Sequence, residues 1–160
     1  MKHKNVIFDK IDYLRFSELG SRLNVSFSSY EAIGNKIIGM DGIKRKVLVA
    51  EKNNGLNLRN IIELSKVIAI TVKKIYTSIK AGELKKRKME DFLQSIHLHF
   101  QFEEEKESVV LPFYERKINK VHDLPRLEKK AGNWQRVLSK MISKQNSGVV
   151  KREGQLKLAG

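Results

Sequence analysis

The chain has 160 residues and contains no cysteine, two prolines and one tryptophan. Without cysteine it can form neither a disulfide nor a thiolate metal site, which fits a reducing compartment. No uninterrupted apolar run approaches the ~20 residues that a membrane-spanning helix needs. The first residues, MKHKNVIFDKIDYLRF, lack the apolar block and the small-residue cleavage site of a signal peptide. We therefore expect a cytoplasmic protein without a transmembrane segment.

Acidic residues are also scarce relative to basic ones. The chain has 18 Asp and Glu against 32 Lys and Arg, a formal charge of +14 and an isoelectric point near 10.0. Such a positive surface attracts phosphate-bearing partners, either anionic lipid headgroups or nucleic acid. The lysines are scattered among acids, however, so an ordinary soluble, lysine-rich surface explains the charge equally well. The hydrophobic fraction of 41% suffices for a packed core.

The segment KIIGMDGIKRKVLVAE, residues 36–51, predicts a β-hairpin. Two apolar runs flank Asp41-Gly42, a dipeptide typical of tight two-residue turns, because such turns need positive φ. The basic stretch 44–46 follows at once, so the second strand would begin with a cationic cluster. A strand at 30–39 would lead into this hairpin.

The first thirty residues and the middle of the chain show different periodicities. Residues 11–19 fit a short amphipathic helix ended by Gly20-Ser21, and 23–28 then alternate as in a strand. Further on, crowded β-branched residues favour strands at 58–64 and 67–76, with a break near Ser65-Lys66, over a helix.

A second hairpin is predicted at 95–114. Apolar and polar residues alternate strictly over 95–102, a charged connection follows at 103–107, and 109–114 returns as a strand. Pro112 removes a donor from the returning strand, which indicates an edge position or a bulge.

The last predicted element is a helix from about 124 to 143, with Asp123 as its N-cap and Pro125 in its first turn. Residues 146–160 read as a flexible, basic tail. The apolar stripe of the helix is spaced by three and four residues and consists of Leu124, Leu127, Ala131, Trp134, Leu138 and Met141.

Several antiparallel strands followed by one amphipathic helix predict an α+β fold. We expect a bent antiparallel sheet or small barrel capped by the C-terminal helix. The predicted division of the chain is an N-terminal extension at 1–29, one domain at 30–145 and the tail at 146–160.

Four segments in this order resemble the pleckstrin-homology-like fold: the hairpin at 36–51, the strand pair at 61–74, the hairpin at 95–114 and the helix at 123–142. That fold is a bent antiparallel barrel of seven strands closed at one end by a helix. A tryptophan in that helix, here Trp134, is a hallmark of its eukaryotic members. The run 30–143 also resembles uncharacterised bacterial proteins that couple such a module to membrane segments.

The resemblance implies a first candidate site for anions. In lipid-binding members of that family, a lysine late in the first strand and basic residues early in the second cradle phosphates. Lys36, Lys44 and Lys46 match this pattern, with lysine in the last place where the family has arginine. Lysine supplies a point charge there instead of bidentate contacts. The alternative is that Lys44 and Lys46 belong to the solvent face of a strand.

A second cationic cluster is the run Lys85, Lys86, Arg87 and Lys88. Four consecutive cations repel one another and favour either water or a polyanion, so the alternative to an anion site is a solvated loop. If this run folded beside the hairpin lysines, the two clusters would form one positive surface.

We expect no metal site, no cofactor and no enzymatic activity. His97 and His99 share one face of a strand, as in some metal sites, but a site needs more ligands. His122 and the run 103–105 could supply further ligands, but nothing in the sequence requires them to. Two solvent-facing polar residues are therefore the simpler interpretation of His97 and His99. No Ser-His-Asp order, glycine-rich phosphate loop, HExxH or paired-carboxylate motif is present.

We therefore expect a non-catalytic binding or scaffold module. It would use a basic surface or an exposed strand edge to bind a protein or anionic lipid headgroups, peripherally at the inner face of the membrane. The alternative is a nucleic-acid-binding protein, although the sequence has neither a helix-turn-helix pair nor aromatic-rich ribonucleoprotein strands. Either function is compatible with a homo-oligomer.

Overall fold

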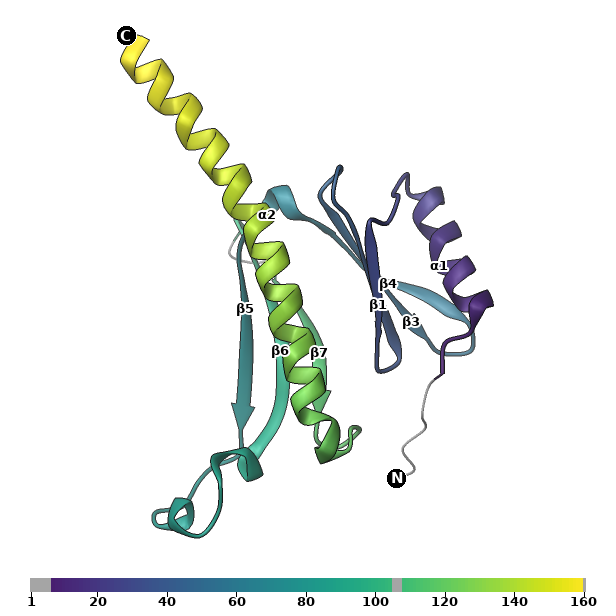
Figure 1. Ribbon diagram of the computed structural model, residues 1–160, viewed down its shortest axis with the longest axis vertical. Helices are drawn as coiled ribbons and strands as arrows, with labels where there is room; N and C mark the ends of the chain where they lie inside the picture. The colour runs from purple at the N-terminus through teal and green to yellow at the C-terminus, as the bar shows by residue number, and fades with distance from the viewer. Residues whose placement is uncertain (1–6, 105–107, 160) are drawn as a thin grey trace. The chain divides into compact units, whose positions relative to one another are not determined.

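The computed structural model describes residues 7–104 and 108–159, with side chains described as far as Ile142. It confirms an α+β fold with antiparallel sheets and a C-terminal helix (Figure 1). Within the described ranges the strands form two separate sheets, of four and three strands, and no closed barrel. The chain divides into two compact units, Met1–Lys66 and Val67–Gly160. This division falls inside the predicted domain 30–145, at the break near Ser65-Lys66.

The first unit is a helix packed on a four-stranded sheet with the order β1-β2-β3-β4. The predicted strand at 30–39 is in fact two strands, because Gly34, with φ 61°, and Asn35 turn the chain between them. The break after the fourth strand is a 3-10 turn. The elements are α1 (Lys10–Arg22), β1 (Ser29–Ile33), β2 (Lys36–Asp41), β3 (Lys46–Lys52), β4 (Leu56–Glu63) and η1 (Leu64–Lys66).

Residues 1–29 are not an extension separate from the sheet, because α1 contributes to its core. Phe16 is 1% exposed and packs in one cluster with Ile37 and Leu48. Its ring stacks on Phe27 with centroids 4.3 Å apart. Gly39 lies beneath both rings, where an added Cβ would approach them to 2.6–2.7 Å. Only glycine therefore fits this position of β2 without displacing the aromatic pair.

The alternating residues 23–28 form no strand. Leu23 caps the C-terminus of α1 and donates its N–H to Gly20 O at 3.0 Å. Asn24 takes φ 60°, and the Val25 N–H returns to the same carbonyl at 2.8 Å. This helix-ending turn consumes the backbone groups that a strand would pair. The alternation instead reflects how Val25 and Phe27 pack against the core.

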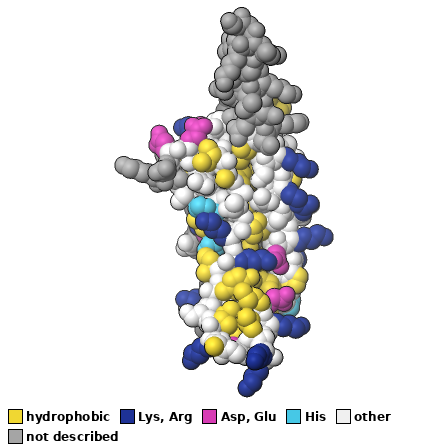
Figure 2. All heavy atoms as spheres, turned by 90° about the vertical axis from the view of Figure 1, so that its left-hand side faces the viewer, with side chains coloured by type: hydrophobic (Ala, Val, Ile, Leu, Met, Phe, Trp, Pro, Cys, Tyr) yellow, Lys and Arg dark blue, Asp and Glu magenta, His cyan; other side chains and the backbone are white. Residues whose placement is uncertain are grey.

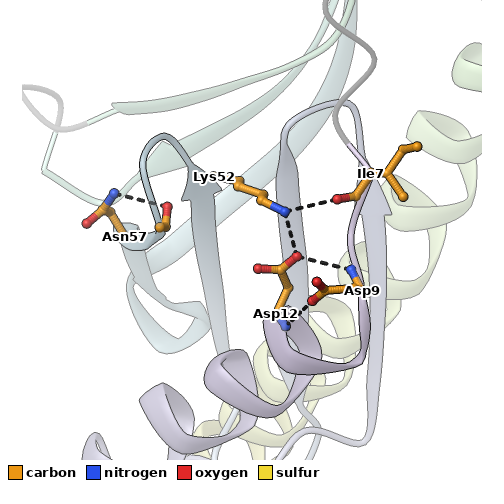
Figure 3. Close-up of polar contacts among 6 residues, drawn as sticks. Ile7, Asp9, Asp12, Lys52 and Asn57 are labelled. Atoms are coloured by element: carbon orange, nitrogen blue, oxygen red, sulfur yellow. Dashed lines mark hydrogen bonds and ion pairs between the residues drawn. The ribbon is translucent and has the colours of Figure 1, made fainter.

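The side chain of Lys52, on β3, contacts both α1 and the segment that precedes it (Figure 3). Its ammonium lies 2.7 Å from Asp12 Oδ2 and 3.0 Å from Ile7 O. Asp12 also completes a capping box with Asp9, accepting the Asp9 N–H at 3.0 Å. Two hydrogen bonds hold the pKa of the buried Asp12 carboxyl below its ordinary value; the one from Lys52 has the larger effect, and the one from the Asp9 N–H the next largest.

Replacing Lys52 with methionine should reduce the free energy of unfolding of the first unit by about 2 kcal/mol, because a buried carboxylate loses its cation. Urea titration, monitored by amide hydrogen exchange in β2 and β3, measures this loss of stability. The double variant Lys52→Met, Asp12→Asn is the matched control, since it removes the unpaired charge but keeps a capping oxygen. It should be more stable than Lys52→Met alone. Equal stability of the two variants would contradict the ion pair's role.

The second unit is a three-stranded sheet, in the order β5-β6-β7, with a long helix across one face (Figure 1). The predicted alternation is confirmed, since Ile96, Leu98 and Phe100 are fully buried. The buried stripe of the helix also matches, with Ile142 buried where Met141 was predicted. Pro112 lies both on an edge strand and beside a register shift. The elements are β5 (Val67–Tyr76), β6 (Leu93–Phe102), β7 (Ser108–Glu115) and α2 (Leu124–Ala159).

Side chains tie α2 to β5 at two places. Lys74 forms an ion pair with Glu128, which raises the pKa of Lys74. Gln135 Nε2 donates to Ile70 O at 3.2 Å. The backbone of α2 continues to Ala159, so residues 146–159 of the segment expected to be a tail are helical, as their lack of proline allows. Of the predicted connection 103–107, residues 105–107 lie outside the described residues.

Candidate anion-binding surfaces

The β2–β3 hairpin exists, but its turn differs from the predicted two-residue turn. Four residues, 42–45, connect the strands, and the positive φ of 57° falls on Arg45. Asp41 holds this loop through its carboxylate, which accepts the N–H groups of Ile43 at 3.0 Å and Lys44 at 2.9 Å. An aspartate that accepts hydrogen bonds from the following backbone N–H groups in this way stabilises a turn through its side chain.

The structure does not bring Lys36, Lys44 and Lys46 together as a phosphate cradle would require. In the β2–β3 register Lys36 lies opposite Glu51 at one end of β2, whereas Lys46 lies opposite Asp41 at the other end. The two lysines are therefore separated by five residues of strand, roughly 17 Å. Lys36 Nζ donates to Asn35 Oδ1 at 3.1 Å, and Lys44 Nζ donates to Asn24 O. The hairpin lysines thus form no common site.

An open cavity of about 570 Å³ lies beside this loop. Its wall combines serine hydroxyls with one ammonium and one carboxylate, so its charges offset one another. The polar residues lining it are Ser21, Asn24, Ser26, Ser28, Asp41 and Lys44. Because Asp41 is buried and negatively charged, this cavity is a poor receptor for an anion.

The second cluster lies in the second unit, at the end of its sheet where β5 finishes, β6 begins and β7 finishes. Two connections project from this end, residues 77–92 and 116–123. Backbone hydrogen bonds fasten both to the sheet: Thr77 N–H to Phe92 O and Arg116 N–H to Gln94 O, each 2.8 Å. The Arg116 guanidinium also donates to Asp91 O. The two connections are therefore neighbours.

We call this region the basic end, and define it as residues 80–91 and 116–126. The first stretch holds five basic and three acidic side chains, and the second holds four basic and one acidic. Eight of these cations are exposed, and Arg116 is half-buried. The nine are Lys80, Lys85, Lys86, Arg87, Lys88, Arg116, Lys117, Lys120 and Arg126.

Local contacts order the run 85–88. Gly82, with φ 86°, begins the 3-10 turn η2 (Glu83–Lys85), and a second turn, η3 (Met89–Phe92), follows. The Arg87 guanidinium stacks 4.8 Å above the Phe92 ring and lies 3.9 Å from Asp91 Oδ2. Arg87 therefore anchors the loop to the buried Phe92, while Lys85, Lys86 and Lys88 are exposed.

Apolar side chains are exposed among these cations. Leu84 is 54% exposed, Met89 47%, Ile118 56% and Val121 59%. Figure 2 shows one face of the molecule, on which hydrophobic side chains gather in the lower part, with both basic and acidic side chains around them. Exposed apolar residues are ordinary when single, but their presence in the same short connections as eight of the nine cations is a distinct surface chemistry.

Sequence reasoning found only the run 85–88 of this surface. It missed the stretch 116–126, although a usable signal was present. In the predicted hairpin 95–114, the segments before and after must leave from the same end of the sheet. The cations of both segments could therefore have been placed together from the predicted hairpin alone.

His97 and His99 lie on the sheet face opposite the buried residues of β6, as predicted. Each is partly exposed, opposite Lys73 and Thr71 of β5, respectively. Burial, with the nearby charge of Lys73, lowers the pKa of His99. Among the described side chains, those of residues 7–104 and 108–142, no group of three or more His, Cys, Asp or Glu could hold a metal ion.

Comparison with protein-family models, curated proteins and solved structures finds no match to this chain. The resemblance to the pleckstrin-homology-like fold therefore stays a prediction. Among the helices of the described residues, none is long and apolar enough to cross a membrane.

Proposed function

We propose that this protein is a non-catalytic binding module that attaches peripherally to anionic membranes through its basic end. The observation that carries the proposal is the convergence of cations from two connections at one end of the second unit. Lysines near an anionic leaflet each contribute about 1 kcal/mol of attraction, so several on one surface suffice for reversible binding. The hairpin lysines Lys36, Lys44 and Lys46 belong to the first unit and lie outside the residues that define the basic end.

The lack of Phe, Tyr and Trp side chains in the basic end favours a membrane over nucleic acid as the partner. Residues 80–91 and 116–126 contain none of these three; beside them, Phe92, Phe113 and Tyr114 are buried, with 5% exposure or less, and Tyr76 is half-buried. Proteins that bind single strands stack bases on exposed aromatic rings, and the basic end offers no such ring. The cations also extend from irregular connections, whereas most sequence-reading modules place a helix or strand in a groove.

Co-sedimentation of the full chain with vesicles tests this proposal. We expect binding to vesicles of phosphatidylcholine mixed with phosphatidylserine, and none to phosphatidylcholine alone. Binding should weaken as salt rises, because the Debye length falls from ~10 Å at 0.1 M to ~3 Å at 1 M. A mixed-sequence DNA duplex and a single-stranded RNA are titrated in parallel. Tighter binding to either nucleic acid than to anionic vesicles would favour the alternative function.

A further inference from the structure

We infer that the basic end inserts apolar side chains into the bilayer interface, so that its ligand is a lipid bilayer and not a soluble polyanion. This inference rests on the proposed function. It adds the insertion of apolar side chains, which electrostatic attraction alone does not require. The inserted residues are Leu84, Met89, Ile118 and Val121, each about half exposed or more.

Cations and apolar residues alternate closely in both connections. Leu84 directly precedes Lys85, and Met89 directly follows Lys88; Ile118 lies between Lys117 and Lys120. A compact soluble phosphate ligand is held by cations that converge on it, and it gains nothing from exposed apolar side chains among them. A membrane interface instead offers headgroup charge and acyl chains within a few ångströms of each other, so it accepts both kinds of side chain at once.

The connections are held well enough to present these side chains. Leu84 lies within η2, which follows the positive φ of Gly82. Arg87 binds back to Phe92 and Asp91, and Arg116 donates to Asp91 O, so the two connections share one anchor. Ile118 donates its N–H to Glu115 O at 2.9 Å, which turns the second connection directly after β7. Ordered loops lose less conformational entropy when they dock.

The absence of cysteine makes a direct test available. Single variants Leu84→Cys and Ile118→Cys are labelled with a polarity-sensitive fluorophore and mixed with phosphatidylserine-containing vesicles. The matched control is Val137→Cys, on the middle of α2, with a similar exposure of 45%. We expect a blue shift and increased emission at positions 84 and 118, and no change at position 137. Inositol hexakisphosphate and single-stranded RNA should leave all three probes unchanged.

A second variant measures what insertion contributes to affinity. A triple variant keeps every charge but replaces three of the apolar residues: Leu84→Ser, Ile118→Ser and Val121→Ser. It should bind anionic vesicles roughly 10- to 100-fold more weakly. The weak binding that remains should disappear at high salt, where the unaltered chain keeps a salt-resistant fraction. Because all three residues are exposed, we expect an unchanged circular dichroism spectrum.

The outcomes separate this inference from the proposed function. Vesicle binding without any change in the probes at 84 and 118, or full affinity in the triple serine variant, would overturn insertion and leave electrostatic membrane attachment standing. If the unaltered chain binds no anionic vesicle at all, the proposed function itself is wrong.

Discussion

Replacing Lys85, Lys86 and Lys88 with glutamate should weaken binding to anionic vesicles by about 100-fold or more at ~0.1 M salt. Each lysine near such a surface contributes about 1 kcal/mol, and each glutamate adds repulsion in its place. A loss of 1.4 kcal/mol is a tenfold change in affinity, so three lysines already account for about 100-fold. Arg87 is left unchanged because it stacks on Phe92 and orders the loop. Quantitative co-sedimentation over a series of lipid concentrations measures the change.

The matched control has the same change in net charge at a different place. Lys10→Glu, Arg15→Glu and Lys140→Glu alter three exposed cations on α1 and on α2 beyond the basic end. This variant should keep most of the affinity, with only the small loss that a more acidic molecule shows at low salt. Equal losses in the two variants would mean that overall charge alone, without a defined surface, governs binding.

A third variant, Lys44→Glu with Lys46→Glu, addresses the hairpin directly. It should bind vesicles nearly as well as the unaltered chain, because these two lysines lie in the first unit and form no common site with Lys36. A loss as large as that of the basic-end variant would restore the hairpin as the binding site.

Much of the fold follows from the sequence because its signals are local and redundant. The strict alternation at 95–102 and the stripe around Trp134 each specify an element by several side chains, and both are confirmed. β-branched residues at 67–76 likewise identify β5, since they suit a strand and crowd a helix.

The missed features depend on contacts between distant segments. The alternation at 23–28 arises from packing of Val25 and Phe27 below α1, and spacing alone does not distinguish that packing from a strand. The division at Lys66 depends on which strands pair, which the sequence of β4 and β5 does not reveal. The basic end likewise depends on two connections meeting, so the run 85–88 indicated only half of it.

The turn after Asp41 is the most instructive error, and it yields the largest predicted effect on stability. Asp41 is 3% exposed. Besides Ile43 and Lys44, its carboxylate accepts the Ser26 N–H at 2.9 Å, so one side chain joins the β2–β3 loop to the segment after α1. The two-residue turn expected for an Asp-Gly pair depends on backbone φ alone, whereas this aspartate acts through its carboxylate.

Asp41→Ala should reduce the free energy of unfolding of the first unit by about 3 kcal/mol, because three backbone donors lose a charged acceptor. Asp41→Asn should cost about half as much, since one oxygen and the volume remain. Amide hydrogen exchange in β2 and β3 reports this unit, and the fluorescence of the buried Trp134 reports the second unit as an internal control. A loss of stability seen only in the Trp134 signal would contradict the conclusion that Asp41 stabilises the first unit.

The pH dependence of the Asp41→Asn variant isolates the carboxylate's charge. The hydrogen bonds from Lys44 and Ser26 lower the pKa of Asp41 below its ordinary value of 3.8. The folded state therefore binds this proton more weakly than the unfolded chain, and the stabilisation is complete above that ordinary value and lost as pH falls through the folded pKa. Asp12 titrates in both proteins and cancels in the difference. The stability gap between the unaltered chain and Asp41→Asn should thus be constant at neutral pH and shrink in acid. A gap that stays constant down to acid unfolding would show that the charge of Asp41 contributes nothing, and that its shape alone holds the loop.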